Sequence, residues 1–385
     1  MRKECIVTIS LVLGLLCSTP VVLAGWGPAK RLTWTAGNSL GPAIALYSSN
    51  IIHLAWSDNS LGNSEIYYER SVDGGKSWSP VRRLTWTNGN SLGPAIAADS
   101  SNAVHVVWTD DTQFFGEIYY KRSKDGGATW GSVKNLSLTS GHSWDADMAI
   151  DSNNWIHVIW EDNTPGNFEI FYTRSKDGGA TWSAPKRLTW TPGNSSVPAL
   201  AIDPSNGIHV LWYDYTPGNY EIFYTRSKDR GATWSAAKRL TWTSGGSFDP
   251  AIAIDSGNAI HVVWQDSTPG SPEIYYKRSK DGGTTWSMAK RLTWTSGQSF
   301  GPVVAADSSS IVYVVWYNGT LDNYEIYCQG SPDSGATWFS IQRLTWLSGV
   351  SSFPDIAVDS LDNVHIVWED NGPGNYEIYF KKGIK

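Results

Sequence analysis

The runs Trp155-Ile-His-Val-Ile-Trp160, Glu169-Ile-Phe-Tyr-Thr173 and Trp182-Ser-Ala-Pro-Lys-Arg-Leu-Thr-Trp190 are short and rich in β-branched and aromatic residues. Each run is bounded by Gly, Asn, Asp, Ser or Pro, which is typical of strands joined by turns. With the preceding run Asp147-Met-Ala-Ile-Asp151, they predict four short strands, named A, B, C and D in chain order. The chain after residue 24 shows no helix-length stripe of apolar residues spaced 3.6 apart.

The same unit recurs along the whole chain with a period of 52 residues. The tripeptide Arg-Leu-Thr marks strand D in six units, beginning at Arg31, Arg83, Arg187, Arg239, Arg291 and Arg343. Asn135-Leu-Ser occupies the one remaining position in this series. A fixed period of this size indicates a solenoid, propeller or array, and four strands per period indicate a propeller blade. Seven units therefore predict seven blades.

The two ends of the repeat region predict how the ring closes. Trp26-Gly-Pro-Ala-Lys-Arg-Leu-Thr33 matches Trp78–Thr85 and so is an isolated strand D. The chain ends after a strand C at Glu377–Lys381, with no strand D of its own. We expect the N-terminal strand to complete the last blade, which removes two open sheet edges. The fold predicted for residues 25–385 is all-β, a single seven-bladed propeller with four antiparallel strands per blade.

The turn between strands C and D repeats the pattern Ser-x-Asp-x-Gly-x-x-Trp, as in Ser123-Lys-Asp125-Gly-Gly-Ala-Thr-Trp130. Ser and Asp side chains bond to nearby backbone N–H groups, and glycine adopts positive φ at low cost. The chain thus resembles the Asp-box (BNR-repeat) propellers, whose best-known members are sialidases. The resemblance implies a structural role for the box aspartates, which are Asp73, Asp125, Asp177, Asp229, Asp281 and Asp333.

The composition excludes several classes of protein. Charged residues make up 17% of the chain and the formal net charge is −6, so nucleic-acid binding by phosphate neutralisation is not expected.

Residues 1–24 have a basic start, an apolar run and a small residue at position 24, which predicts a signal peptide cut before Gly25. We therefore expect a secreted or periplasmic monomer without a membrane span. Cys328 is then the single cysteine left, and we expect it to be a buried thiol.

Two loop sets lie on the face opposite the boxes, where the resemblance places a binding site. Aromatic rings stack on sugars and carboxylates bond to hydroxyls, so both sets are candidates for ligand binding; the alternative is that these residues pack between blades or hold their own loops. The aromatic candidates are Trp34, Trp86, Trp144, Trp190, Trp242, Trp294 and Trp346. The carboxylate candidates, which could also hold calcium, are Asp58, Asp110, Asp162, Asp214, Asp266 and Asp370. Since no loop has the spacing of a known calcium motif, we expect no metal or other cofactor.

Catalysis would need residues that break the repeat. By resemblance, a sialidase needs three arginines, a Tyr–Glu nucleophile pair and an Asp acid, and the arginines of this chain are repeat residues. Another glycosidase would need two carboxylates about 5 to 10 Å apart. The third unit departs most from the pattern, at His142, Asp145 and Asp147, while Asp249 and Asp355 depart in the same way elsewhere. If one catalytic site exists, we expect it at His142, Asp145 and Asp147.

The near-identical units favour a secreted, non-catalytic propeller that recognises glycans or another extracellular ligand through repeated sites. Linked equivalent sites would gain avidity. Two alternatives stay open: a sialidase-like glycoside hydrolase, and a protein-binding scaffold whose blades reflect duplication.

Overall fold

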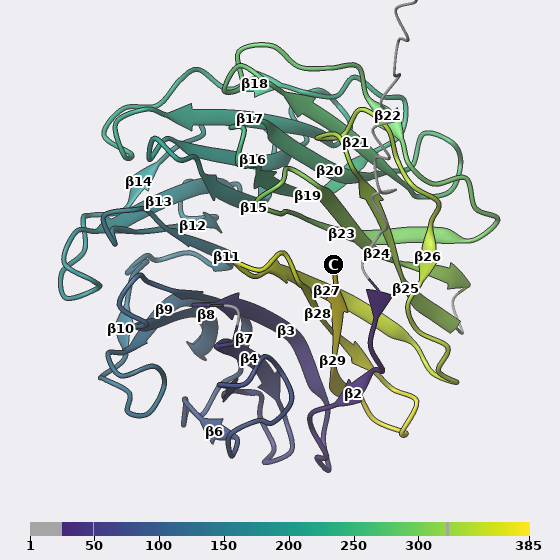
Figure 1. The fold of residues 1–385 in the computed structure, drawn as a ribbon. Coiled ribbons are helices and arrows are strands. Elements are labelled where there is room, and N and C mark those ends of the chain that lie inside the picture. The colour runs from purple at the N-terminus through teal and green to yellow at the C-terminus, as the bar shows by residue number, and fades with distance from the viewer. Residues whose placement is uncertain (1–24, 49, 321–322) are drawn as a thin grey trace, which may run out of the picture.

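The computed structural model describes residues 25–385 except residue 49 and residues 321–322. In this part of the chain all regular elements are strands, and they form seven antiparallel sheets arranged as blades around an axis (Figure 1). The predicted seven-bladed all-β propeller is confirmed. The predicted signal peptide at residues 1–24 lies outside the described residues. Among those described, no helix is long and apolar enough to span a membrane.

Each blade runs from strand A near the axis to strand D at the outer rim (Figure 1). The A strands are β3 (Ser39–Leu46), β7 (Ser91–Ala98), β11 (Ser143–Ile150), β15 (Ser195–Ile202), β19 (Ser247–Ile254), β23 (Gln298–Ala306) and β27 (Ser351–Val358). The B strands are β4 (Ile52–Asp58), β8 (Val104–Gln113), β12 (Ile156–Asp162), β16 (Ile208–Asp214), β20 (Ile260–Asp266), β24 (Val312–Thr320) and β28 (Val364–Asp370).

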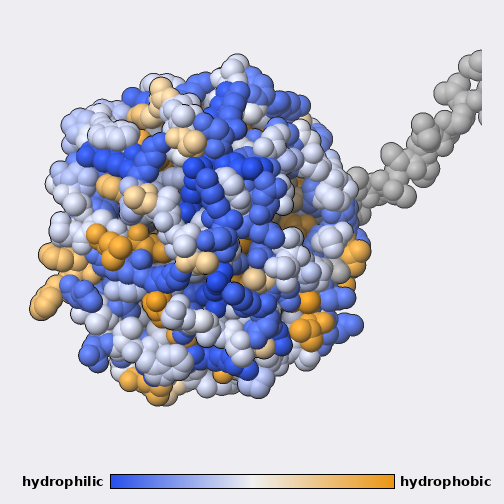
Figure 2. Space-filling view, turned by 90° about the vertical axis from the view of Figure 1, so that its left-hand side faces the viewer, coloured by the Kyte–Doolittle hydropathy of each residue, from blue (hydrophilic) through white to orange (hydrophobic). Residues whose placement is uncertain are grey.

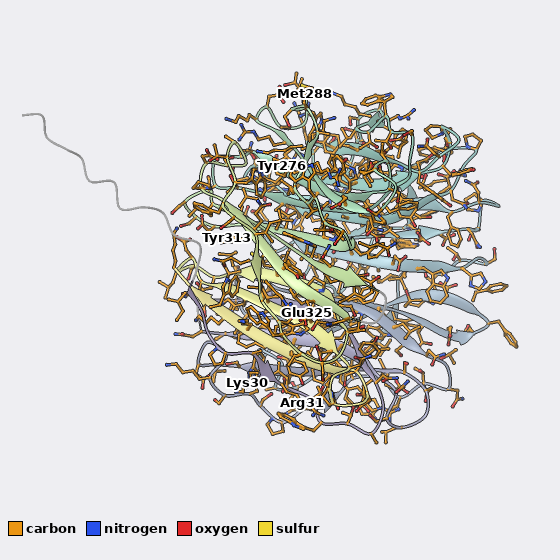
Figure 3. All side chains as sticks on the ribbon, turned by 90° about the vertical axis from the view of Figure 1, so that its right-hand side faces the viewer. Lys30, Arg31, Tyr276, Met288, Tyr313 and Glu325 are labelled. Carbon is orange, nitrogen blue, oxygen red and sulfur yellow. The ribbon has the colours of Figure 1, made fainter. Side chains whose placement is uncertain are left out.

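The C strands are β5 (Glu65–Ser71), β9 (Phe115–Ser123), β13 (Glu169–Ser175), β17 (Glu221–Ser227), β21 (Glu273–Ser279), β25 (Asn323–Ser331) and β29 (Glu377–Ile384). The D strands are β6 (Arg82–Arg83), β10 (Lys134–Asn135), β14 (Lys186–Arg187), β18 (Lys238–Arg239), β22 (Lys290–Arg291), β26 (Gln342–Arg343) and β2 (Lys30–Arg31). In side view, Lys30 and Arg31 lie at the outer edge on one side of the molecule and Met288, just before β22, lies at the edge opposite (Figure 3).

The seam of the ring is closed by the N-terminal segment. Strands β1 (Gly25–Trp26) and β2 both pair antiparallel with β29, with Trp26 opposite Gly383 and Arg31 opposite Tyr379. The indole N–H of Trp26 also donates to Oε1 of Gln342 in the neighbouring blade at 2.8 Å. The last blade is therefore built from both ends of the described chain, as predicted.

The hydrophobic core lies between adjacent blades. In one of its seven clusters, Leu211, Ile222 and Tyr224 of one blade pack on Ile260 and Trp264 of the next. The seven tryptophans of strand B are at most 1% exposed, and Cys328 is fully buried, as predicted. Burial of this kind contributes about 25 cal/mol per Å² of apolar surface removed from water, so the interfaces between blades dominate stability.

The Asp boxes join neighbouring blades. In the box of β17 and β18, Asp229 accepts hydrogen bonds from the Ser227 hydroxyl at 2.7 Å and from the Thr233 N–H at 2.8 Å. Gly231 in this box has φ +84° and touches Tyr172 of the preceding blade, because a Cβ at this position would lie 2.1 Å from the tyrosine Oη. Trp234 packs edge-on against the same tyrosine ring, with centroids 5.1 Å apart.

The opposite face carries the B–C loops and the D–A loops, as the antiparallel strand order predicts. The two loop sets are bonded to each other, since Nδ2 of Asn219 in a B–C loop donates to the carbonyl of Gly245 in the following D–A loop at 2.7 Å. The six histidines in the middle of strand B are at most 2% exposed and so belong to the core.

Candidate functional site

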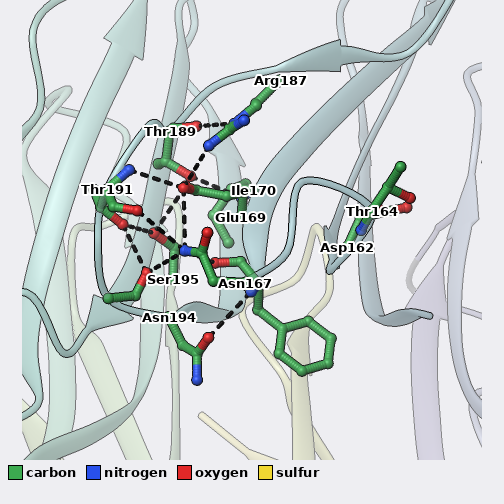
Figure 4. Close-up of polar contacts among 12 residues, drawn as sticks. Asp162, Thr164, Asn167, Glu169, Ile170, Arg187, Thr189, Thr191, Asn194 and Ser195 are labelled. Atoms are coloured by element: carbon green, nitrogen blue, oxygen red, sulfur yellow. Dashed lines mark hydrogen bonds and ion pairs between the residues drawn. The ribbon is translucent and has the colours of Figure 1, made fainter. Parts of the chain in front are cut away.

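A buried ion pair fixes the end of strand D in six blades. In blade three, Nη2 of Arg187 in β14 lies 2.7 Å from Oε1 of Glu169, the first residue of β13, and the glutamate is fully buried (Figure 4). The arginine Nε donates to the carbonyl of Thr189 at 2.6 Å. The other five pairs have N–O distances of 2.5–2.8 Å. A carboxylate with these donors is a rigid anchor for the loop that follows.

The same carboxylate orders the D–A loop. Oε1 of Glu169 also accepts from the N–H of Thr191 at 2.8 Å (Figure 4). Nδ2 of Asn167 bridges from the B–C loop to the carbonyls of Thr191 and Gly193. Trp190 lies between Thr189, whose carbonyl accepts from Arg187, and Thr191, whose N–H donates to Glu169, so its backbone is held on both sides.

The six tryptophans that follow Arg-Leu-Thr are held rigidly and yet exposed to solvent. Their exposed fractions are 66–69%, whereas the strand B tryptophans are buried. The guanidinium carbon of the preceding arginine lies 5.5–5.7 Å from each ring centroid, within the range of a cation–π contact. They are Trp34, Trp86, Trp190, Trp242, Trp294 and Trp346. Blade two has Leu138 at this position, 76% exposed.

The repeated aspartates of the B–C loops lie inside their own blades. Asp162 is fully buried; its Oδ2 accepts from the hydroxyl of Ser143 and its Oδ1 from the N–H of Thr164, both at 2.8 Å. Equivalent bonds are made by Asp58, Asp110, Asp214, Asp266 and Asp370. Ligand binding by these aspartates stays a prediction, and the geometry favours the alternative that they hold their loops.

His142 and Trp144 form a separate aromatic group with the β8–β9 hairpin. The two rings stack at a centroid distance of 6.3 Å, and Phe115 contacts His142 edge-on at 5.0 Å. Nδ1 of His142 accepts from the N–H of Gly116 at 3.3 Å. His142 therefore packs against neighbouring loops, and its predicted catalytic role stays a prediction.

Carboxylates that break the repeat gather on the inner strands. Oδ2 of Asp147 accepts from the N–H of Leu200 in the next blade at 2.8 Å, and Asp355 makes the same bond to Ile44 at 2.9 Å. Asp147 and Asp355 thus join the A strands of adjacent blades. Asp145 lies at a bulge in β11 with φ +51° and is exposed to solvent.

Burial raises the pKa of several carboxyls on the inner strands. It raises the pKa of Asp147 and Glu161 to about 7 and that of Asp249 to about 6. The charge of Asp145 adds to the rise in pKa at Glu161 and at Asp249. Raised carboxyl pKa values are a feature of catalytic acids and of buried structural acids alike.

Tyr213 of β16 is affected electrostatically by the same acids. Burial raises the pKa of Tyr213 strongly, and the charges of Glu161, Asp249 and Asp145 raise it further. Tyr213 follows the buried tryptophan of β16. This repeat position varies, although the residue before it is Trp in all seven blades and the residue after it is Asp in six of them. It holds Ser57, Thr109, Glu161, Tyr213, Gln265, Tyr317 and Glu369. Variation at an otherwise regular repeat is the signal in the sequence that could have identified Tyr213 as a candidate site residue.

The Glu161 carboxyl predicts a specific pH dependence of stability. Its folded pKa of about 7 lies above its ordinary value of 4.5, so the stabilisation from its proton is complete below pH 4.5 and is lost as pH rises through 7. Glu161→Gln keeps an acceptor for the N–H of Val197, as Gln265 does for Gly301. From pH 5 to 8, wild type is expected to lose about 2 kcal/mol relative to this variant. Denaturant unfolding across this range measures the difference, and parallel pH profiles would contradict the prediction.

The described inner strands lack the groups that would grip an anionic substrate. No arginine occurs on strands A and B in the part of the chain that the structure describes. The strand C arginines bond to box carbonyls of the next blade, as Arg226 does to Gly282. Among the described residues, no three His, Cys, Asp or Glu side chains are grouped closely enough to hold a metal ion.

Comparison with known proteins agrees with this geometry. The profile of the BNR repeat-like domain matches residues 150–366, which is more than half of the chain. The chain belongs to the BNR repeat-like family.

Two curated relatives are similar in sequence to part of this BNR repeat-like chain. Xyloglucanase Xgh74A of Acetivibrio thermocellus is 26% identical over 251 residues, covering 56% of this chain and 28% of that protein. A sialidase of Bacteroides fragilis is 24% identical over 316 residues, covering 70% of this chain and 55% of that protein. The chain therefore spans between about a quarter and about half of the length of these relatives.

Solved structures share the fold at low sequence identity. A polysaccharide lyase of family PL25, an ulvan lyase, has a TM-score of 0.63 at 12% identity, covering 91% of this chain and 95% of that chain. A protein of unknown function from Dyadobacter fermentans has a TM-score of 0.57 at 14% identity, covering 93% and 99%. Identities this low indicate a shared propeller architecture, and function depends on the site.

Proposed function

We propose that this protein is a non-catalytic carbohydrate-binding propeller whose binding sites are centred on the six exposed tryptophans. The observation that carries the proposal is that each ring is about two-thirds exposed, although tryptophan is ordinarily among the well-buried residues. The guanidinium of an arginine lies against each ring, and this arginine is paired with a buried glutamate. A rigid aromatic platform stacks on the apolar face of a pyranose with little loss of side-chain entropy.

The surroundings of the rings support a polar ligand. The side of the molecule shown in Figure 2 has apolar residues in small separate patches among polar ones; the tryptophans themselves are not marked in this view. Two relatives are named as a xyloglucanase and a sialidase, which are names of enzymes that act on glycans. Six similar sites on one ring would bind a multivalent glycan surface with avidity. Secretion, as residues 1–24 predict, would place the sites where such surfaces occur.

The test is a glycan array with a variant that replaces all six rings by alanine. Binding to multivalent glycans is expected to fall by about 100-fold or more, because each single contact is weak and avidity is lost. Exposed side chains contribute little to stability, so the variant is expected to fold normally. Trp155→Ala is the matched control, since Trp155 contacts Arg174 and Arg230 on the box face. Undiminished binding by the six-fold variant would refute the proposal.

The acids of the inner strands support a second candidate function, glycoside hydrolysis. A carboxyl with a pKa near 7, such as Glu161, can act as a general acid at neutral pH while Asp145 or Asp249 supplies a second carboxylate. A panel of fluorogenic glycosides, sialosides included, tests this function. If the protein hydrolyses a glycoside and this turnover disappears in Asp145→Ala or Asp147→Ala, glycoside hydrolysis replaces non-catalytic binding as the function. Absence of both turnover and glycan binding would favour a protein-binding scaffold.

A further inference from the structure

Three of the six tryptophan sites carry a lysine from the neighbouring blade. Nζ of Lys121 in β9 lies 5.4 Å from the centroid of Trp86 and donates to the carbonyl of Leu84 at 2.6 Å. The same arrangement joins Lys277 of β21 to Trp242 at 5.8 Å and Lys381 of β29 to Trp346 at 5.6 Å. In both, the lysine again donates to a leucine carbonyl at 2.6 Å.

These lysines are largely buried without a carboxylate partner. Lys121 is 8% exposed and Lys381 is 7% exposed. In the part of the chain that the structure describes, the lysines within 4.0 Å of a carboxylate are Lys382 and Lys385. Burial lowers the pKa of Lys121, which reflects the cost of holding a charge away from water. An ammonium held in this way has donor capacity left for an anion, since it has three donors.

The remaining blades have other residues at the equivalent position in strand C. In the repeat alignment, Glu69 corresponds to the lysine at the Trp34 site, Thr225 at the Trp190 site and Gln329 at the Trp294 site. The ring therefore contains two kinds of tryptophan site, three with a lysine and three with an acidic or neutral residue. This difference can determine ligand specificity, because the tryptophan is the same in all six sites and only the strand C residue beside it changes.

A cavity opens beside the first of the lysine sites. It has a volume of about 320 Å³, and its lining includes Trp86, Lys121, Tyr119 and Trp108. Trp108 is 1% exposed, so part of the cavity lining belongs to the buried core of the blade. A second cavity of about 430 Å³ shares Trp86 and Lys121 and adds Arg83. The volume of the first suits one or two sugar rings.

We infer that the sites at Trp86, Trp242 and Trp346 bind saccharides that carry an anionic group, a carboxylate or a sulfate, which Lys121, Lys277 and Lys381 recognise. The sites at Trp34, Trp190 and Trp294 take neutral saccharides. In a lysine site, the sugar ring stacks on the indole while its anionic group accepts from the ammonium. This inference rests on the proposed function and deepens it, because it assigns a chemical class of ligand to each site.

The test compares two soluble probes, an oligogalacturonate and a neutral galacto-oligosaccharide of the same length, by titration calorimetry. The main variant carries Lys121→Thr, Lys277→Thr and Lys381→Thr; threonine occupies the equivalent position at Thr173 and Thr225, so the fold accepts it. Affinity for the oligogalacturonate is expected to fall by at least 10-fold, and affinity for the neutral probe is expected to stay the same. A sulfated galacto-oligosaccharide distinguishes sulfate from carboxylate recognition, and binding of either supports the inference.

The matched control removes an equal number of positive charges, three, from the box face. Lys124→Thr, Lys228→Thr and Lys280→Thr change exposed lysines of the C–D turns, and this variant is expected to bind as wild type does. Equal losses in both variants would overturn the inference, because they would show non-specific attraction. Retention of oligogalacturonate binding in Trp86→Ala, Trp242→Ala, Trp346→Ala would overturn it as well. Failure of wild type to bind any of the probes, together with an empty glycan array, would overturn the proposed function itself.

Discussion

Gly231→Ala is expected to destabilise the protein by about 3 kcal/mol. An alanine Cβ would lie 2.1 Å from Oη of Tyr172, far inside van der Waals contact, and that tyrosine is held in place by His157 at 2.7 Å. The clash is with the preceding blade, so relief requires two blades to move apart. Overpacking of this kind costs about 1–3 kcal/mol, and the left-handed backbone at φ +84° adds about 1 kcal/mol.

Gly218→Ala is the matched control for this prediction. Gly218 also has a positive φ, of +97°, but nothing lies within 4 Å of its added Cβ. The control therefore reports backbone strain alone, about 1 kcal/mol. Denaturant unfolding of both variants at one pH gives the difference, which measures the contact between blades. Equal destabilisation of the two variants would show that the box glycine does not act through Tyr172.

Glu221→Ala is expected to cost about 3 kcal/mol and to weaken binding at the Trp242 site. The fully buried carboxylate of Glu221 accepts from Arg239 and from the N–H of Thr243, both at 2.8 Å. Removal of the carboxylate leaves Nη2 of Arg239, whose side chain is partly buried, and the loop N–H without their protein acceptor. Arg239 also stacks on Trp242 at 5.5 Å, so loss of its anchor releases the platform.

Glu221→Gln separates the geometry from the charge. The amide oxygen keeps an acceptor for Arg239 and Thr243, so this variant is expected to lose less stability than the alanine variant and to keep the ring in place. Denaturant unfolding measures stability, and glycan affinity is compared in the background where the other five rings are alanine. A Glu221→Ala protein with wild-type stability and wild-type affinity would show that the ion pair does not support the site.

The propeller could be predicted from the sequence because every feature that defines it is local and repeated. The 52-residue period fixed the number of blades, and the isolated strand D at Trp26–Thr33 indicated the seam. The bulges in strand A were not predicted, because non-glycine residues such as Asp145 and Val197 adopt the left-handed conformation there (φ +51° and +48°). That conformation depends on inter-blade bonds, such as the one from the N–H of Val197 to Glu161, that no local pattern reveals.

The candidate sites were predicted in part. The sequence identified the tryptophans after Arg-Leu-Thr, but it could not separate a packed ring from an exposed one, because the exposure of a ring depends on how neighbouring blades pack. It singled out Asp145, Asp147, Asp249 and Asp355 as irregular without showing that ring closure brings distant blades together. It missed Lys121 and its equivalents, because their partner tryptophans lie in another blade about 35 residues earlier in the chain.

The closed seam also determines how the molecule comes apart. In an open array of repeats, the terminal units have one neighbour each, and unfolding begins by fraying at those units. Here β1 and β2 complete the sheet of β29, so every blade is packed between two others. Loss of any one blade breaks two packed interfaces at once, which makes partial opening costly. Resistance of the blades to proteolysis therefore follows the stability of the whole ring rather than that of its weakest unit.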